Sequence, residues 1–372
     1  MKTLKKLSLS EIKKFLEKKG LRILYKKEKK FNLSSDFKNF YYTALSGLMM
    51  VLFFSVLPII NNVKRNSQET NNNSKINLEK VFNGDTIESQ KEEDLDTAKV
   101  FQDIFEFDDV PSDTVRLSAD VIGQIFKDTN YDILDVRKNK LVKPISLSLL
   151  PKEIKKIESV KKRKDLFIQI ILPLILAETN QIRIDRKKLF NIINKNSNSD
   201  AEKKWLKIKF TQYGVKNNDL SVLKVRMDEI PSSLSIAQAA KETGWGTSRF
   251  ALEGNALFGQ WTYSENGIKP IDSDSDKTHR IMKFKILKAS IRAYYRNLNT
   301  HSGYKGFRKA RAELRDNEEK LDSLILVDYL DKYAATGADY IRILKKIISQ
   351  NSLKDFDDVK LLPTTSGLKN LI

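Results

Sequence analysis

One uncharged segment, residues 40–60, constrains the fold of this chain more than any other feature. Its 21 residues are mostly apolar, and a helix needs about 20 such residues to cross a bilayer. A buried helix of this length normally keeps a polar stripe, and none is visible here. A cleaved signal peptide would have a shorter apolar core and a small-residue cleavage site, whereas this segment ends in Pro58, Ile59 and Ile60. We therefore expect one transmembrane helix at 40–60.

The charges before this segment predict its orientation. Residues 1–39 hold 13 Lys/Arg against 4 Asp/Glu, and basic segments next to a membrane span stay in the cytoplasm. We therefore expect residues 1–39 to be a basic cytoplasmic segment whose lysines lie near anionic lipid headgroups. Everything after residue 60 is then expected outside the cytoplasm.

Residues 61–130 have the composition of a linker. They hold 8 Lys/Arg against 15 Asp/Glu and are rich in Asn and Ser, which favours a solvated and largely flexible segment. As a flexible coil, this acidic and polar linker would span about 45–50 Å. That length suits a tether between a membrane and a nearby layer, although a spacer of unselected length fits equally well.

The composition of the rest of the chain narrows its chemistry. Residues 131–372 carry a net charge of +17, which favours a polyanion: nucleic acid, anionic lipid or an acidic wall polymer. The predicted topology argues against nucleic acid. The whole chain has no Cys and two His, which excludes disulfides, thiol nucleophiles and Cys-ligated metals and argues against a multi-histidine metal site. We expect neither a metal nor a cofactor.

From residue 131 onward the pattern is that of a mainly helical domain. Leu166–Ala177 is almost wholly apolar but too short to span a membrane, which predicts a buried core helix with a kink at Pro173. Ala201–Tyr213 is amphipathic, and the turn at Pro231 predicts the start of another helix. Alternation within Ile281–Leu287 predicts a strand. Further helices are expected at 289–300, 307–316, 321–334 and 338–350.

A helix of small residues that reaches Glu242 is the strongest functional signal. It contains Ala237 and is followed at once by Gly244-Trp245-Gly246, where the backbone must bend sharply. This pattern places one carboxyl group at a helix C-terminus beside an indole ring. A carboxyl group against an aromatic wall loses hydration, so its pKa rises and it can serve as a general acid near neutral pH.

The same stretch imitates the GxGxxG fingerprint of dinucleotide-binding sites. The imitation fails because Arg249 stands where the last glycine belongs. It also fails because a helix, rather than a strand, comes before it. We therefore reject a nucleotide site.

Residues 255–288 predict a small irregular lobe, because glycine, asparagine and aromatic residues alternate there with short β signals. A cleft between this lobe and the helices would suit a polysaccharide, with Trp261 and Tyr263 stacking on sugar faces. A glycosidase usually needs a second carboxylate. Alternatively, the N-acetyl group of the substrate replaces the second carboxylate by attacking the anomeric carbon, and the protein supplies only the acid and positioning groups. The candidate carboxylates are Glu265, Asp272, Asp274 and Asp276.

Residues 131–350 resemble the peptidoglycan N-acetylglucosaminidases of the flagellar-muramidase type, glycoside hydrolase family 73, and most of all their Bax-like branch. The resemblance rests on Ala237–Phe258, where Gly-Trp-Gly-Thr-Ser-Arg-Phe-Ala closely follows the glutamate. Supporting stretches are Val160–Ile168, Leu172–Leu176, Asn297–His301 and Tyr304–Arg315. The resemblance implies a mainly α (α+β), lysozyme-like two-lobed domain with a small irregular β lobe. It also implies hydrolysis of the β-1,4 bond on the reducing side of N-acetylglucosamine.

The resemblance also assigns roles to single residues. Glu242 falls on the family's proton donor, and Tyr333 falls on the first tyrosine of a Tyr-Ala-Thr motif that lines the cleft. This chain departs from that motif, because it reads Tyr-Ala-Ala-Thr-Gly from Tyr333. We expect Glu242 and Tyr333 to be catalytic. The residues expected to bind substrate are Trp245, Gly246, Ser248, Asn255, Phe258, Gln260, Trp261, Tyr263 and Tyr340.

Together these observations give one functional hypothesis and one alternative. The hypothesis is a single-pass protein of the bacterial inner membrane whose catalytic domain, residues 131–372, hydrolyses peptidoglycan glycan strands in the periplasm. The alternative is a non-catalytic peptidoglycan-binding scaffold that positions other wall enzymes. Under neither hypothesis do we expect nucleic acid to be a partner.

Overall fold

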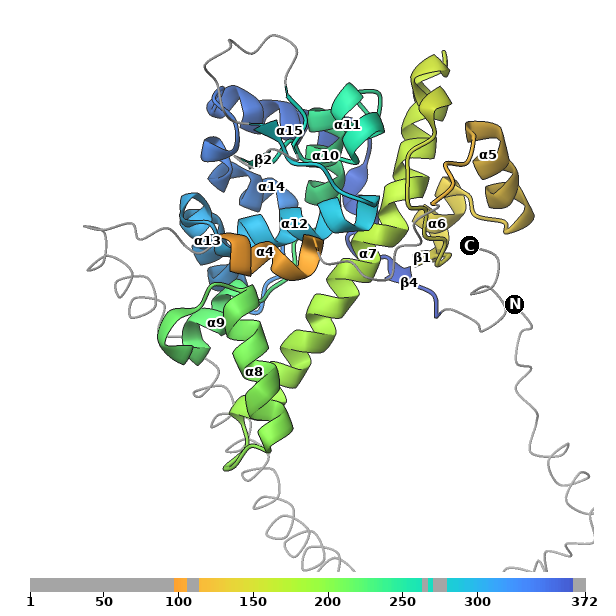
Figure 1. Ribbon diagram of the computed structural model, residues 1–372. Helices are drawn as coiled ribbons and strands as arrows, with labels where there is room; N and C mark the ends of the chain where they lie inside the picture. The colour runs from red at the N-terminus through yellow and green to blue at the C-terminus, as the bar shows by residue number, and fades with distance from the viewer. Residues whose placement is uncertain (1–96, 106–113, 263–266, 270–279, 364–372) are drawn as a thin grey trace, which may run out of the picture. The chain divides into compact units, whose positions relative to one another are not determined.

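The computed structural model describes residues 97–105, 114–262, 267–269 and 280–363, which are coloured in Figure 1. All of them belong to one compact unit, residues 75–372, and the other unit is residues 1–74. The predicted cytoplasmic segment, the transmembrane helix at 40–60 and most of the linker lie outside the described residues. The boundaries proposed for these segments therefore stay predictions.

The longest described helix, α7 (Val160–Ile193), forms the core of this unit (Figure 1). Its apolar part is buried against α10 (Ser232–Thr243) and α12 (Leu287–Thr300). The buried core helix predicted at Leu166–Ala177 is thus confirmed, and the chain stays helical through Pro173. By length and composition alone α7 is a candidate membrane span, but 72% of its most apolar window is buried inside the protein.

The prediction for α7 was wrong in length. The helix has 34 residues, whereas the apolar run that suggested it ends at Ala177. Beyond that point buried Ile182, Leu189 and Ile192 recur among polar residues. Their spacing of seven and three residues keeps one face of the helix apolar, which is the helical period rather than a continuous run.

α10 carries the glutamate motif and is buried along most of its length between α7, α15 (Ala338–Gln350) and the 3₁₀ turn η6 (Leu353–Phe356). The helix begins after Pro231, as predicted, but none of its own side chains caps it. Instead, the backbone N–H and the hydroxyl of Ser233 both donate to the Asp357 carboxylate at 2.8 Å. A residue far along the chain therefore supplies the cap.

α12 contacts α7 and also α4 (Thr97–Phe105). The contact with α4 includes an apolar cluster around Phe101, Ile104 and Phe284 and an ion pair between Arg296 and Asp103 at 3.2 Å. This packing explains why the predicted strand Ile281–Leu287 was wrong beyond its first residue. Phe284 belongs to the apolar cluster rather than to a strand, and α12 begins at Leu287.

The remaining helices follow the predicted pattern with one exception. Helix 201–213 appears as α8 (Asp200–Gln212). The helix predicted at 321–334 is broken into α14 (Ser323–Leu326) and two 3₁₀ turns, because Leu330 and Tyr333 donate backbone hydrogen bonds three residues back. The other described helices are α5 (Ala119–Asp128), α6 (Ile133–Asn139), α9 (Leu220–Arg226), α11 (Arg249–Gly254) and α13 (Lys305–Asp316). The 3₁₀ turns are η1 (Lys152–Lys156), η2 (Lys216–Asn218), η3 (Ser302–Tyr304), η4 (Val327–Tyr329) and η5 (Asp331–Tyr333).

Strands are few and short in the described part of the chain. β1 (Leu141–Val142) pairs in parallel with β4 (Lys360–Leu361). β2 (Trp261–Thr262) pairs antiparallel with β3 (Arg280–Ile281), with Trp261 opposite Ile281. The fold is therefore mainly α with a minor β component, in keeping with the lysozyme-like domain expected from the sequence.

A buried ionic network fixes α13 to the chain that leads into α10. Arg311 is 0% exposed and donates to Asn299 Oδ1 at 2.7 Å. Burial raises the pKa of Asp228, but Arg186, Arg311 and Arg315 overcome this and hold it at about 2. A carboxyl with a depressed folded-state pKa stabilises the fold above its ordinary pKa, and this stability is lost as pH falls toward 2.

Candidate active site

The turn after α10 bends the chain through three successive residues with positive φ. Gly244 ends the helix at φ 57°, Trp245 follows at 61° and Gly246 at 82°. A non-glycine residue in this region costs about 1–2 kcal/mol, so Trp245 must be held there by its surroundings. The Thr243 hydroxyl accepts from the Gly246 N–H at 2.8 Å and donates to the Ala239 carbonyl at 2.6 Å.

Gly246 seats this turn on the core. A Cβ atom at Gly246 would lie 2.8 Å from Phe167 Cδ2 and 3.1 Å from Ile154 Cδ1. The Trp245 ring meets the Phe167 ring edge-on, with centroids 6.0 Å apart, and Lys164 Nζ lies 4.8 Å from the Trp245 ring centroid. Glycine is therefore required at 246 for both conformation and space, and the turn is fixed against α7.

Glu242 stands in the last turn of α10, half-buried. Burial raises the pKa of its carboxyl, while a hydrogen-bonding interaction with Tyr340 and the charge of Lys241 act in the opposite direction. The backbone of Gly259 approaches closely, since a Cβ there would lie 3.2 Å from Glu242 Oε2. The raised pKa matches the prediction, but the groups that the structure gives around this carboxyl are tyrosines and Gly259, whereas Trp245 packs on Phe167.

A directed chain of hydrogen bonds leads to Glu242 through the core. The Tyr294 hydroxyl donates to Gln238 Oε1 at 2.7 Å, and Gln238 Nε2 donates to the Tyr340 hydroxyl oxygen at 3.0 Å. All three side chains are at most 1% exposed. Because Tyr340 accepts from Gln238, its own proton is free to point to Glu242. Gln238 thus orients Tyr340 as a donor to the carboxylate.

Two further tyrosines lie close to this chain. Tyr333 stacks on Tyr340, with centroids 5.5 Å apart, and its hydroxyl donates to the Phe258 carbonyl at 2.8 Å. The centroid of Tyr304 lies 5.9 Å from that of Tyr333. Burial raises the pKa of Tyr304 to about 12 and that of Tyr333 well above its usual range, and the charge of Glu242 adds to both. These hydroxyls therefore stay protonated at neutral pH and act as donors.

Several residues expected to bind substrate also make structural hydrogen bonds. The Ser248 side chain caps α11 by accepting from the Ala251 N–H at 3.2 Å. Asn255 Nδ2 donates to the Phe284 carbonyl at 3.0 Å, and Gln260 Nε2 donates to the Ala293 carbonyl at 3.1 Å. Phe258 is 1% exposed and stacks on Tyr294. These contacts tie the segment after α11 to α12 and so hold Gly259 against Glu242.

The small-lobe candidates are only partly described. Trp261 is 58% exposed in β2, a position from which a ring can stack on a sugar. Tyr263, Glu265, Asp272, Asp274 and Asp276 all lie outside the described residues. Within the part that the structure describes, the polar groups that act on the pKa of Glu242 are Tyr340 and Lys241, and no cluster of three or more His, Cys, Asp or Glu forms a metal site.

Sequence reasoning missed Gln238, Tyr294, Tyr304 and Gly259. One signal was available for Gln238, because it stands four residues before Glu242 and therefore on the same helix face. It is also a large polar residue among serines and alanines, and it is 0% exposed. A buried amide in a helix of small residues must find partners, and here these are two tyrosines.

Substitution of Tyr340 by Phe tests the hydrogen-bond chain. Loss of the hydroxyl removes the donor that favours the charged carboxylate, so the pKa of Glu242 should rise further. Gln238 Nε2 is also left unpaired in the core, which destabilises the fold by about 1–3 kcal/mol. Titration of the Glu242 carboxyl by NMR and thermal unfolding measure the two effects. Tyr329→Phe, at a tyrosine that is 40% exposed, is the control. An unchanged pKa of Glu242 in Tyr340→Phe would contradict the hydrogen-bond chain.

Comparison with known proteins places the molecule in a family. The family model Glucosaminidase, described as mannosyl-glycoprotein endo-beta-N-acetylglucosaminidase, matches residues 223–353. Protein bax of Escherichia coli (strain K12) is 31% identical over 210 residues, which are 55% of this chain and 75% of that protein. The chain belongs to the Bax-like branch of the glucosaminidase family. No solved structure matches it.

As a Bax-like family member, the protein falls among peptidoglycan-related glycosidases. The residues that match the family model include Gln238, Glu242 and the four tyrosines described above. The family match therefore covers the whole described surroundings of Glu242. The long helix α7 and the helix α8 lie before the matched residues.

Proposed function

We propose that this protein hydrolyses the β-1,4 glycosidic bond of N-acetylglucosamine in peptidoglycan, with Glu242 as the general acid. The observation that carries the proposal is the half-buried Glu242 carboxyl at the end of α10, whose pKa is raised by burial. A general acid must hold its proton at the working pH and give it up in the transition state. Burial helps Glu242 to hold its proton. The Tyr340 hydroxyl stabilises the carboxylate that forms when Glu242 releases this proton.

In the proposed reaction, Glu242 donates its proton to the glycosidic oxygen as the bond from this oxygen to the anomeric carbon breaks. Positive charge develops on the sugar ring and must be met from the other side. Either a small-lobe carboxylate or the substrate's own acetamido oxygen takes this part, and water then completes the hydrolysis. Tyr304 and Tyr333 remain protonated, which suits them to position the substrate rather than to act as bases.

We test the proposal with the detergent-solubilised full chain and purified peptidoglycan sacculi. New reducing ends should appear with time, and Glu242→Gln should abolish most of their release. A protein that sediments with sacculi but releases no reducing ends, and that binds equally well as Glu242→Gln, would instead be the non-catalytic scaffold.

The proposed location is the periplasmic face of the bacterial inner membrane, with residues 40–60 as a single span. One support is the uncharged segment preceded by 13 Lys/Arg in residues 1–39, because basic segments next to a span stay in the cytoplasm. The other is the proposed substrate, since peptidoglycan lies outside the cytoplasm. Protease added to intact spheroplasts should degrade residues 131–372 and leave a membrane-bound N-terminal fragment. Protection of residues 131–372 until the spheroplasts are lysed would contradict the topology.

A further inference from the structure

The second half of α7 forms an arm together with α8. Its core is separate from the main one and consists of Leu189, Phe210, Tyr213, Val215, Leu223 and Met227. In Figure 1, α8 and this end of α7 lie away from α10 and α11. We call residues 183–212 the α7–α8 arm. It precedes the segment that matches the glucosaminidase family, residues 223–353, so that the proposed catalytic role does not account for it.

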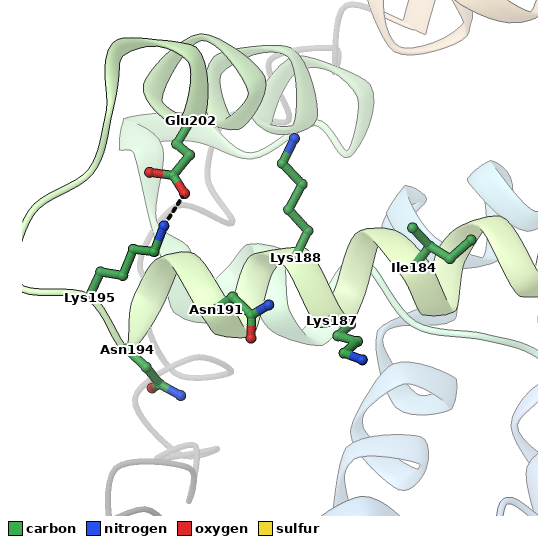
Figure 2. A pocket seen from close by; sticks show the side chains of 7 residues that line it. All are labelled: Ile184, Lys187, Lys188, Asn191, Asn194, Lys195 and Glu202. Atoms are coloured by element: carbon green, nitrogen blue, oxygen red, sulfur yellow. Dashed lines mark hydrogen bonds and ion pairs between the residues drawn. The ribbon is translucent and has the colours of Figure 1, made fainter.

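The outer face of the arm holds a surface depression of about 520 Å³ (Figure 2). Its α7 residues recur every three or four positions, which places them on one side of the helix. Buried Asp185, Leu189 and Ile192 occupy the opposite side. The lining residues are Ile184, Lys187, Lys188, Asn191, Asn194, Lys195 and Glu202.

The arm has more positive charge than its own acids can neutralise. Between residues 183 and 209 there are nine Lys/Arg and three Asp/Glu. Two of the basic residues, Arg183 and Arg186, pair with Glu229 and Asp228 outside this range. Each acid already has a basic partner within the arm: Asp185 with Lys209, Asp200 with Lys203, and Glu202 with Lys195.

Three exposed lysines make up much of the excess. Lys187, Lys204 and Lys207 have no carboxylate partner among the described residues. Lys188 Nζ lies 4.7 Å from the Trp205 ring centroid. This contact holds the Lys188 ammonium group between α7 and α8, beside the depression. The resulting surface attracts anions.

The arrangement of these groups indicates the kind of anion. Figure 2 shows Lys188, on α7, and Lys195, just after α7, reaching toward α8, while Lys187 and Asn194 point away from α8. The ammonium groups are exposed and point in different directions instead of converging on one point. The lining contains no arginine, whose guanidinium could bind a single phosphate or carboxylate through two parallel hydrogen bonds. A flexible polymer with many separate negative charges fits such a surface better than one small anion does.

We infer that the α7–α8 arm is a second, non-catalytic binding site for an acidic glycan polymer, recognised through the peptide carboxylates of peptidoglycan. This inference rests on the proposed function, because it assigns the arm the same polymer that Glu242 is proposed to cleave. Two sites on one chain that engage the same strand raise the effective concentration of the substrate at the second site. The arm therefore retains the protein on insoluble wall material between cleavage events.

Sedimentation with sacculi tests the inference separately from catalysis. We use the full chain with Glu242→Gln, so that no strand is cleaved, and compare it with a variant that also carries Lys187→Gln, Lys188→Gln and Lys195→Gln. The triple change should weaken binding about tenfold at low salt and flatten its dependence on salt. The matched control is Lys138→Gln with Lys309→Gln and Lys346→Gln, three exposed lysines outside the arm. Of these, Lys309 has a carboxylate partner, Glu313, as Lys195 has Glu202. Arginine at 187, 188 and 195 keeps the charge and should restore binding.

Sacculi whose carboxyl groups have been amidated test whether the carboxylates of the polymer are the groups that the arm binds. The parent protein should bind these amidated sacculi as weakly as the triple variant binds untreated sacculi. The triple change should then cause no further loss of binding to amidated sacculi. Equal binding of parent and triple variant to untreated sacculi would overturn the inference. So would a loss that appears only with vesicles of anionic phospholipid, because the arm would then be a membrane site. Release of reducing ends by the protein with native Glu242 is measured separately, so that failure of the arm and failure of the proposed hydrolysis give different results.

Discussion

Glu242→Gln should lower the release of reducing ends from sacculi by about 10²–10⁴-fold, the range that a general acid contributes. Glutamine keeps the size and much of the hydrogen bonding of the side chain but has no proton to donate to the glycosidic oxygen. A neutral glutamine fits the same half-buried position beside Tyr340 and needs no ionised group there, so we expect the fold to persist. Circular dichroism and the rate of reducing-end release measure the two expectations.

The pH profile of the native protein gives a second readout of the same group. Because burial raises the pKa of Glu242, the protonated form persists above the ordinary pKa of a glutamate. Activity should therefore fall as pH rises through this raised pKa, and the alkaline limb should disappear in the residual activity of Glu242→Gln.

The control is Glu253→Gln, at an exposed glutamate in α11 that pairs with Arg249 at 3.4 Å. This change should leave both the rate and the pH profile unchanged. If Glu242→Gln retains the native rate, Glu242 is not the general acid, whatever the pKa of its carboxyl.

Gly246→Ala should be the most destabilising of the substitutions proposed here. Alanine at φ 82° is strained, and its Cβ would lie 2.8 Å from Phe167 Cδ2 in the core. Strain of about 1–3 kcal/mol and overpacking of about 1–3 kcal/mol together predict a loss of about 2–6 kcal/mol. Thermal unfolding should show a Tm lower by about 5–15 °C. Activity should also fall at temperatures where the variant stays folded, because the turn sets the end of α10.

Gly123→Ala is the matched control. Gly123 lies within α5, and a Cβ there would meet nothing within 4 Å. Alanine is the better helix former, so this change should leave stability unchanged or raise it by up to about 1 kcal/mol. A Gly246→Ala protein as stable as Gly123→Ala would show that the turn is not fixed by the packing on Phe167.

The sequence was informative where function depends on local pattern. Gly-Trp-Gly after a helix of small residues predicted both the sharp turn and a desolvated Glu242. It could not reveal which groups desolvate the carboxyl, because Tyr340 and Gly259 reach it from distant parts of the chain. The Tyr294–Gln238–Tyr340 chain joins three helices, and its direction follows from donor and acceptor geometry that only the fold determines.

Errors in the fold prediction have the same origin. The continuous apolar run revealed the first half of α7, whereas the second half depends on a periodic face that meets α8 and α9. Alternation around Lys283 and Lys285 indicated a strand, yet Phe284 packs against α4, which lies far earlier in the sequence. Local periodicity therefore predicts which residues are buried more reliably than it predicts their partners.

The chemistry of the new chain end tests the central claim most directly. Sacculi digested by the purified full chain are reduced with borohydride, hydrolysed in acid and analysed for reduced amino sugars. Cleavage on the reducing side of N-acetylglucosamine predicts glucosaminitol in an amount that grows with digestion and is lost in Glu242→Gln. Muramitol in its place, or glucosaminitol that is undiminished in Glu242→Gln, would contradict the account.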